Sequence, residues 1–234
     1  MFTDEVYPNS PLIEVVFEIR FPPELAVEGR RHEFWEKVRD VYPSLLVPTG
    51  SPGQPLSLIP YRFEQEDNQA GIMMAINRFS LYVRKYEGFR KFKKEFLRMH
   101  RLFGETFSLD RVTRIGLRYI NLIPFGREDG LIPLNRFLTL GFQWPPVIPE
   151  RFKNLSLTFI SRIDGGTITT KLEPVVRDDG QEALLLDFDY SKEGEGLIFT
   201  QVDTYMDEAR AFIRQLFEAL ITDEYRQYLK GDTL

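Results

Sequence analysis

The chain has 234 residues, a length typical of one or two domains, and 43% of these residues are hydrophobic. It contains no cysteine, which excludes a disulfide framework, a thiolate zinc site and a cysteine nucleophile. The net charge of −5 disfavours a protein that wraps duplex nucleic acid, because such proteins are usually basic.

The N-terminus, MFTDEVYPNS, is polar and acidic and lacks the apolar segment of a signal peptide. No apolar run approaches the ~20 residues that a membrane span needs. The sequence therefore predicts a soluble, cytoplasmic protein that does not contact a membrane. It also predicts no cofactor, because no cofactor motif is present.

The first half opens with strict apolar–polar alternation over residues 12–21, which predicts a strand that ends at Pro22. A helix is expected over 27–42, where the apolar residues recur at helical spacing up to Pro43. A loop follows, then three strands and an amphipathic helix with a basic outer face. Their expected ranges are 47–55 for the loop, 56–66, 70–77 and 79–86 for the strands, and 88–103 for the helix.

The second half repeats this order. A strand, a short helix and three further strands are expected, followed by a long helix with an apolar stripe. These elements are expected at 111–122, 131–140, 153–163, 167–174, 182–190 and 201–222.

The fold class predicted is therefore α+β, in two pseudo-symmetric β-α-β-β-β-α halves, 1–108 and 109–234, repeated at about 100 residues. The halves are expected to join edge to edge in one compact unit, with about eight strands in a curved antiparallel sheet and the helices on its convex face. This arrangement resembles the duplicated saddle of TATA-binding-protein-like folds, and such a topological resemblance implies no function. The strands at 79–86 and 182–190 are the expected sheet edges, where a homodimer could form.

Two stretches, PLIEVVFEIRF at 11–21 and RVTRIGLRYIN at 111–121, place opposite charges on equivalent strands. If these strands pair antiparallel at the centre, Glu14 approaches Arg118 and Glu18 approaches Arg114. One interpretation is structural, because such pairs fix the register. The other is a polar, mixed-charge binding site on the same face. The residues expected there are Glu14, Glu18, Arg84, Arg114, Arg118, Tyr119, Asn121, Asp187 and Asp189, with Tyr82 and Lys171 beside them.

The segments NSPLIEVVFEIRF at 9–21 and RIGLRYIN at 114–121 also resemble the signature segments of a sporadically distributed, uncharacterised prokaryotic protein family of about this chain length. This resemblance covers essentially the whole chain. It implies a prokaryotic cytoplasmic protein of unknown activity, linked to mobile or defence genes. It brings no catalytic residues.

Catalytic motifs are sparse. His32 and His100 are the only histidines, and the glycines at 164–166 and 194–196 lack the setting of a phosphate-binding loop. The alternating carboxylates Asp187 and Asp189 leave open a hydrolase that works through paired carboxylates or a bound cation. Their alternation is equally typical of a solvated strand face.

A second alternative is nucleic-acid binding through the basic segment 84–101, although the net charge disfavours it. The candidate residues are Arg90, Lys91, Lys93, Lys94, Arg98 and Arg101. A solvated helix face explains the same run of charges. The leading hypothesis is accordingly a non-enzymatic module that binds a protein or a small molecule on the open face of the central sheet.

Overall fold

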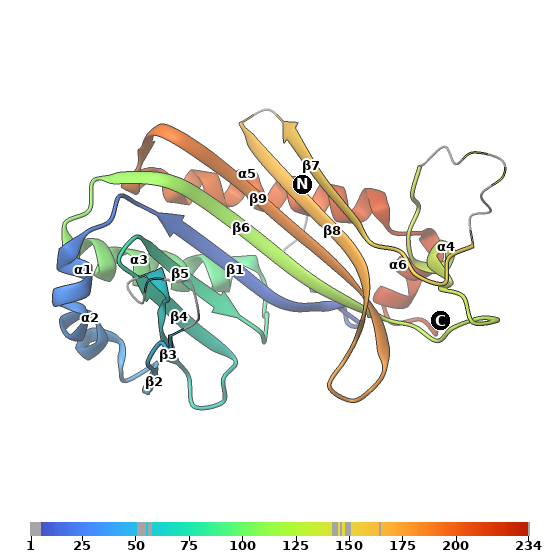
Figure 1. Cartoon of the computed structure of the whole chain (residues 1–234), viewed down its shortest axis with the longest axis horizontal. Coiled ribbons are helices and arrows are strands. Elements are labelled where there is room, and N and C mark those ends of the chain that lie inside the picture. Colours follow the sequence, from blue (N-terminus) through green and yellow to red (C-terminus); the bar gives the residue numbers. More distant parts are fainter. Residues whose placement is uncertain are drawn as a thin grey trace.

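The computed structural model describes residues 6–50, 55, 58–141, 145, 147, 151–163 and 165–233. Its strands form one antiparallel sheet of nine, in the order β2-β3-β4-β5-β1-β6-β9-β8-β7 (Figure 1). The α+β class is thus confirmed. No helix in the described part of the chain is long and apolar enough to cross a membrane.

The elements before residue 109 are, in chain order, β1 (Leu12–Arg20), α1 (Leu25–Gly29), α2 (Arg31–Val38), β2 (Ser44–Leu46), β3 (Tyr61–Glu64), β4 (Ala70–Ala75), β5 (Arg78–Val83) and α3 (Phe89–Phe107). Those after it are β6 (Arg111–Pro124), α4 (Leu134–Phe137), β7 (Leu157–Ile163), β8 (Gly166–Val176), β9 (Glu182–Ile198), a 3-10 turn at Phe199–Gln201, α5 (Val202–Leu220) and α6 (Asp223–Leu229).

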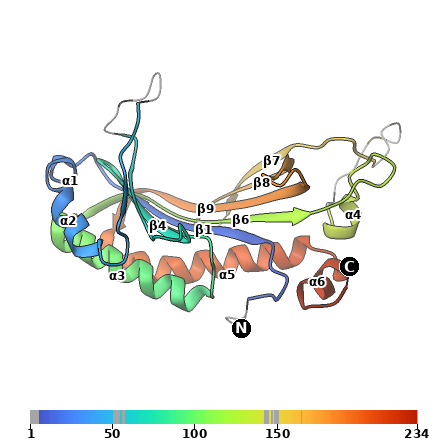
Figure 2. The same cartoon turned by 90° about the horizontal axis from the view of Figure 1, so that it is seen from below.

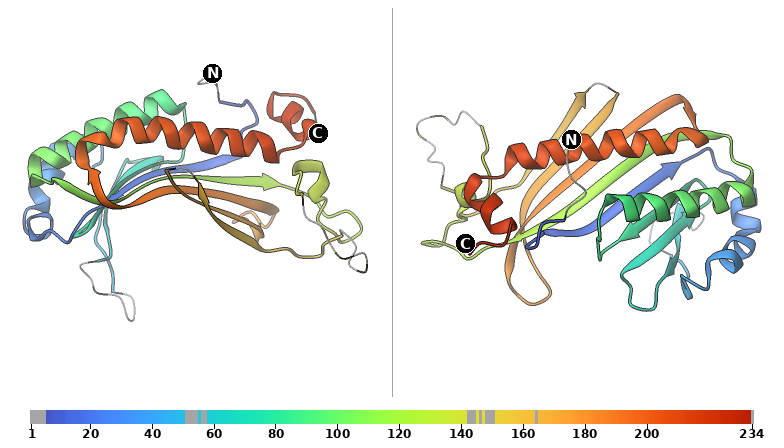
Figure 3. Two further views of the ribbon diagram at one scale, coloured as in Figure 1. Left: turned by 90° about the horizontal axis from the view of Figure 1, so that it is seen from above. Right: turned by 180° about the vertical axis from the view of Figure 1, so that it is seen from behind.

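The long helices α3 and α5 lie side by side against one face of the sheet, and the other face is open (Figures 2 and 3). At both ends the sheet bends away from these helices, so that they cover its convex side (Figure 2). Alternation explains this layering, because Val15, Phe17 and Ile19 of β1 are fully buried towards the helices. The residues between them face the open side.

Phenylalanines fill the space between the sheet and α3. Phe17 meets Phe96 at a ring-centroid distance of 4.4 Å, and Phe79 stacks on Phe103 at the same distance. All five apolar positions expected on the inner stripe of this helix are buried, namely Phe89, Phe92, Phe96, Met99 and Phe103. Burying aromatic side chains contributes strongly to stability because each removes a large apolar area from water.

The centre of the sheet matches the prediction. Strand β1 pairs antiparallel with β6, so that Phe17 lies opposite Leu117 and Glu18 opposite Gly116. The last strand of each half, β5 or β9, flanks this pair. This is the strand order that two joined β-α-β-β-β-α halves would have. Their origin by internal duplication remains a prediction.

Several boundaries differ from the prediction. The helix expected at 27–42 is divided into α1 and α2 at Arg30, whose backbone leaves the helical region at φ −114° and ψ 17°. Strand β2 and helix α6 were not predicted. Strand β9 continues to Ile198 because it pairs with β6 along nearly its whole length.

The expected edges were wrong. Strand β5 lies between β4 and β1, and β9 lies between β6 and β8, so neither offers a free edge. The edges in the described sheet are β2 and β7.

Candidate functional site

The charged residues of the two central strands project from the open face. On β6, Ile115, Leu117 and Tyr119 are buried towards the helices, so Arg114 and Arg118, offset by one residue, point the other way. Tyr119 therefore does not share a face with the arginines, and neither does Asn121. Placing these two residues in the open-face site was wrong, because the side-chain period of a strand is two.

Arg114 is the most enclosed cation of the open face, with only 11% of its side chain exposed. Its guanidinium hydrogen-bonds Glu18 at 3.2 Å and Asp189 at 2.9 Å, and its Nε lies 3.3 Å from Glu193. The predicted Glu18–Arg114 pair is thus confirmed. Burial raises the pKa of Asp189 above its ordinary value, against the lowering effect of Arg114.

Gly116 creates the space that Arg114 occupies. A Cβ built on Gly116 would lie 2.6 Å from Nη1 of Arg114, well inside van der Waals contact. Gly116 is not among the glycines with positive φ, so its backbone conformation is open to other residues. The glycine is needed because the guanidinium lies flat across the strand.

Arg118 and Glu14 take partners other than each other. Arg118 forms a bidentate pair with Asp187, at 2.8 Å from Nε and 2.6 Å from Nη2, and these bonds raise the pKa of Arg118. Glu14 accepts a hydrogen bond from Arg84 at 3.1 Å. Glu14 lies opposite Ile120, in the same register that brings Glu18 to Arg114, so the register allows the expected Glu14–Arg118 pair. The pair does not form because each of its two side chains is bonded to another partner.

Across the centre of the open face the charges alternate in sign from strand to strand. We call the following set the charge ladder: Asp187 and Asp189 on β9, Arg114 and Arg118 on β6, Glu14 and Glu18 on β1, and Arg84 just past β5. Each member has an oppositely charged partner within the ladder. The arrangement favours the structural interpretation, since it fixes the register and is largely neutralised internally.

The neighbouring residues Tyr82 and Lys171 follow the same pattern. Tyr82 is buried over Gly71 and donates a hydrogen bond to Glu64, and burial raises its pKa to about 12. Lys171 pairs with Glu173 at 2.6 Å.

The basic segment of α3 is largely neutralised as well. Lys93 pairs with Asp203 and Asp207 of α5, Lys91 with Glu87, and Arg98 with Glu95. A groove along α3 does contain Lys91, Lys94, Arg98 and Arg101. It also contains four acidic residues, so it lacks the single-sign stripe typical of phosphate-backbone binding.

The two histidines lie on different helices and do not line the pocket described below. His32 is exposed on α2. His100 of α3 is 7% exposed and stacks on Phe199 at 3.8 Å. Burial lowers its pKa to about 4, so the imidazole is neutral near pH 7.

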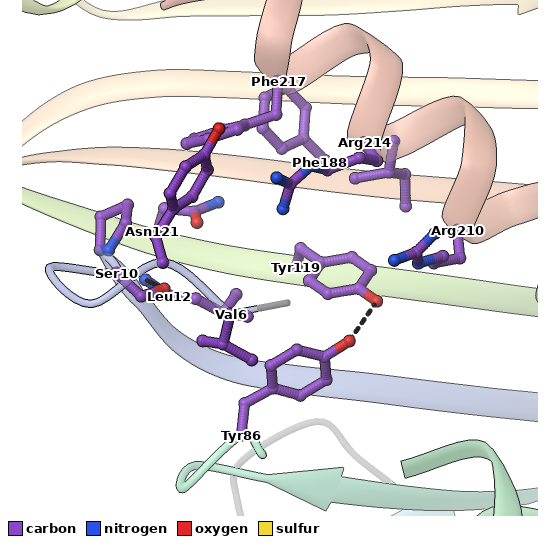
Figure 4. Close-up of a pocket in the computed structure, with 13 residues that line it drawn as sticks. Val6, Ser10, Leu12, Tyr86, Tyr119, Asn121, Phe188, Arg210, Arg214 and Phe217 are labelled. Atoms are coloured by element: carbon purple, nitrogen blue, oxygen red, sulfur yellow. Dashed lines mark hydrogen bonds between the residues drawn. The ribbon is translucent and has the colours of Figure 1, made fainter. Parts of the chain in front are cut away.

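A pocket of about 70 Å³ opens on the helix side of β1 and β6, beneath α5 (Figure 4). Its walls are apolar on several sides, with Leu12, Phe188, Ile213 and Phe217. The remaining lining residues are Val6, Tyr7, Ser10, Pro11, Tyr86, Tyr119, Asn121, Arg210 and Arg214.

The charged side chains that line this pocket, in the part of the chain that the structure describes, are both arginines. Arg210 and Arg214 stand four residues apart on α5 and so lie on one helix face. None of the described lining residues is an aspartate or glutamate. Arg210 lies over the ring of Phe89 at 5.3 Å, and Nε of Arg214 lies 2.9 Å from Glu218, outside the pocket lining.

Two tyrosine hydroxyls meet beside the arginines. Those of Tyr86 and Tyr119 are 3.3 Å apart, and Figure 4 shows Tyr119 close to Arg210. Burial raises the pKa of Tyr119 well above its ordinary value, against the lowering effect of Arg210 and Arg214. Tyr119 is therefore a neutral hydroxyl, able to donate a hydrogen bond.

The N-terminal segment 6–12 forms one wall of the pocket and is anchored to the C-terminal helices. Tyr7 donates a hydrogen bond to Glu218 of α5 at 2.7 Å, and its ring lies 4.7 Å beneath the guanidinium of Arg214. Asn9 bonds the carbonyl oxygens of Tyr228 and Leu229. This wall is thus held in place by side-chain and backbone groups of α5 and α6.

Comparison with known protein families and curated proteins finds no match for this chain. The family resemblance of residues 9–21 and 114–121 therefore remains an expectation.

A metal centre finds no support in the residues that the structure describes. They contain no group of three or more histidine, cysteine, aspartate or glutamate side chains arranged to hold a metal ion. Asp187 and Asp189, the candidate hydrolase pair, are each bonded to an arginine.

Of the predicted site residues, the structure brings together the charge ladder on one face and sends Tyr119 and Asn121 to the pocket on the other. Sequence reasoning missed Arg210, Arg214 and Tyr86. The spacing of Arg210 and Arg214 could have indicated a polar site, because the two arginines lie four residues apart, directly beside the buried stripe of α5. The contribution of Tyr86, which precedes α3, depends on tertiary contacts alone.

Proposed function

We propose that this chain is a binding module for a small organic anion, and that the pocket between β6 and α5 is its site. The observation that carries the proposal is the lining: two arginines and two tyrosine hydroxyls surround an open space, with no carboxylate among the described lining residues. A site with arginines and apolar walls attracts a negatively charged ligand that has an apolar body.

Arginine suits this role because its planar guanidinium binds carboxylate or phosphate oxygens through two parallel hydrogen bonds. The hydroxyls of Tyr119 and Tyr86 bond each other, so one of the two would add a neutral donor to the same oxygens. The apolar side chains of Leu12, Ile213 and Phe217 would enclose the rest of the ligand. The small volume favours a short-chain carboxylate or a small phosphate ester over a nucleotide.

Binding without catalysis is the function that the lining supports best. The described lining residues include no histidine, cysteine or carboxylate to move a proton or attack a substrate. The charge ladder supports a ligand site less well, because its members are already bonded to one another.

A thermal-shift panel tests the proposal, since a ligand that binds only the folded state raises the melting temperature. Short mono- and dicarboxylates and small phosphate esters are compared with the matching uncharged amides and alcohols. We expect at least one anion to raise the melting temperature, and its amide to have no effect.

The control compares two variants, each of which removes one positive charge, inside the pocket or away from it. Arg210→Gln should abolish the anion-induced shift, and Arg101→Gln, at an exposed position on α3, should leave it intact. A panel without any shift, or equal losses in the two variants, would contradict the proposal.

A further inference from the structure

The edge strand β7 has the features of a strand that is normally paired. It contributes seven residues, LTFISRI, and within the described sheet it pairs only with β8. The five residues from Thr158 to Arg162 are all exposed, and Ile160 is 72% exposed. An exposed edge of this length and apolar content is normally avoided in monomeric proteins, because its free N–H and C=O groups recruit other strands.

The opposite edge shows how this chain protects a strand. There β2 has only three residues, and Pro43 and Pro48 stand on either side of it. By contrast, β7 contains no proline, glycine or lysine, and its register with β8 runs without a bulge. The protective devices found at one edge are absent from the other.

The sequence of β7 is compatible with pairing to itself. In an antiparallel arrangement about a twofold axis at Ile160, this residue faces its own copy. The single charge, Arg162, then faces Thr158 of the second copy, so no like charges oppose each other. A twofold axis at Arg162 would instead place two guanidinium groups face to face.

We propose that β7 is a self-association surface, at which a second copy of this chain pairs antiparallel about Ile160. Directly opposite residues of an antiparallel pair project to the same side of the sheet. The dimer therefore joins the two sheets into one, with all four long helices on one side and the two open faces continuous on the other. This surface is separate from the anion pocket, to which β7 contributes no lining residue.

The mass of the protein in solution is the first test. Light scattering after size exclusion should give twice the chain mass of 27.5 kDa. Ile160→Lys should convert the protein to a monomer, because it sets two ammonium groups against each other and its side chain is too exposed to affect folding. Leu25→Lys, at a residue that is 77% exposed on α1, should remain dimeric.

Disulfide trapping tests the register of the two β7 strands. The chain has no native cysteine, so an introduced cysteine can form a disulfide only with its own copy. Directly opposite Cβ atoms in an antiparallel pair are close enough for a disulfide after small adjustments. Under mild oxidation Ile160→Cys should therefore cross-link much faster than Ser161→Cys or Leu25→Cys. A wild-type monomer at high concentration, an Ile160→Lys dimer, or equal cross-linking rates would each overturn the proposal.

Discussion

The guanidinium of Arg114 lies across the backbone of Gly116, in the space where any other residue would place its Cβ. This contact allows one arginine to reach Glu18 on one side and Asp189 on the other. Three strands of the sheet are thereby joined by a single side chain. Breaking an enclosed ion pair costs more than breaking an exposed one, because the partner that remains is an enclosed charge without compensation.

Gly116→Ala should therefore destabilise the protein by about 1–3 kcal/mol, because the added methyl group displaces the Arg114 guanidinium from its bonds to Glu18 and Asp189. Gly126→Ala is the matched control, since nothing lies within 4 Å of a Cβ built there. Urea unfolding measures both variants. The penalty should shrink in an Arg114→Ala background, and an undiminished penalty there would show that the cause is the backbone of β6.

Asp187 and Arg118 should be more strongly coupled than an ordinary surface pair. The Asp187 side chain is only 9% exposed, so Arg118→Gln would leave an enclosed carboxylate without its bidentate partner. We expect a loss of about 1–3 kcal/mol in the free energy of unfolding. The equivalent change at Arg177, which pairs with the exposed Asp179 in a turn, should cost less than about 0.5 kcal/mol. Similar losses in the two variants would count against any structural role of the ladder.

The central sheet could be predicted from the sequence, whereas the pocket could not, and the reason is physical. Alternation in residues 12–21 and 111–122 is a local property that predicts strands, and the repeated order of elements then predicted β1 beside β6 and Glu18 beside Arg114, as observed. The same alternation should have excluded Tyr119 from the open face. The pocket depends on Arg210, Tyr86 and the N-terminal segment meeting beneath one helix. Such convergence is set by the packing of α5 on the sheet, which no local pattern encodes.

Strand β2 and helix α6 were missed because their local signals are weak. The three residues of β2 are too few to show a period, and β2 forms because β3 supplies backbone hydrogen-bond partners for it. Helix α6 begins with Thr222, which accepts a hydrogen bond from the backbone of Tyr225. That cap follows α5 after a single extended residue, Ile221, and the seven residues of α6 are too few to show a clear helical period.

His100 predicts how stability depends on pH. Its pKa is about 4 in the folded protein and near 6.5 when the chain is unfolded, so the unfolded state binds more protons between these values. Stability from this residue is complete above pH 6.5 and is lost as the pH falls towards 4, at up to about 1.4 kcal/mol per pH unit. Comparing the free energy of unfolding at pH 7 and pH 5 measures the effect.

The variants isolate this residue from the carboxylates that titrate in the same range. His100→Asn and His100→Phe should both lose less stability between pH 7 and pH 5 than the wild type does. His32→Asn, at an exposed position, should behave as the wild type. If the His100 variants kept the full pH dependence, protonation of this imidazole would not be its source.

Binding of a carboxylate in the pocket should be nearly independent of pH between about 6 and 9. The described lining residues that ionise are arginines and tyrosines. Arginine stays charged throughout this range, and burial raises the pKa of Tyr119 well above 10. A carboxylate ligand is also fully ionised above pH 6, so neither partner changes its charge. Calorimetric titration at several pH values, with a carboxylate found in the thermal-shift panel, measures the dissociation constant. Tyr119→Phe should weaken binding by removing one neutral donor while leaving the profile flat.

A dissociation constant that rises steeply from pH 7 to pH 9 in the wild type would place the bound anion against a different, titrating cation such as the α-amino group, and not against Arg210 and Arg214.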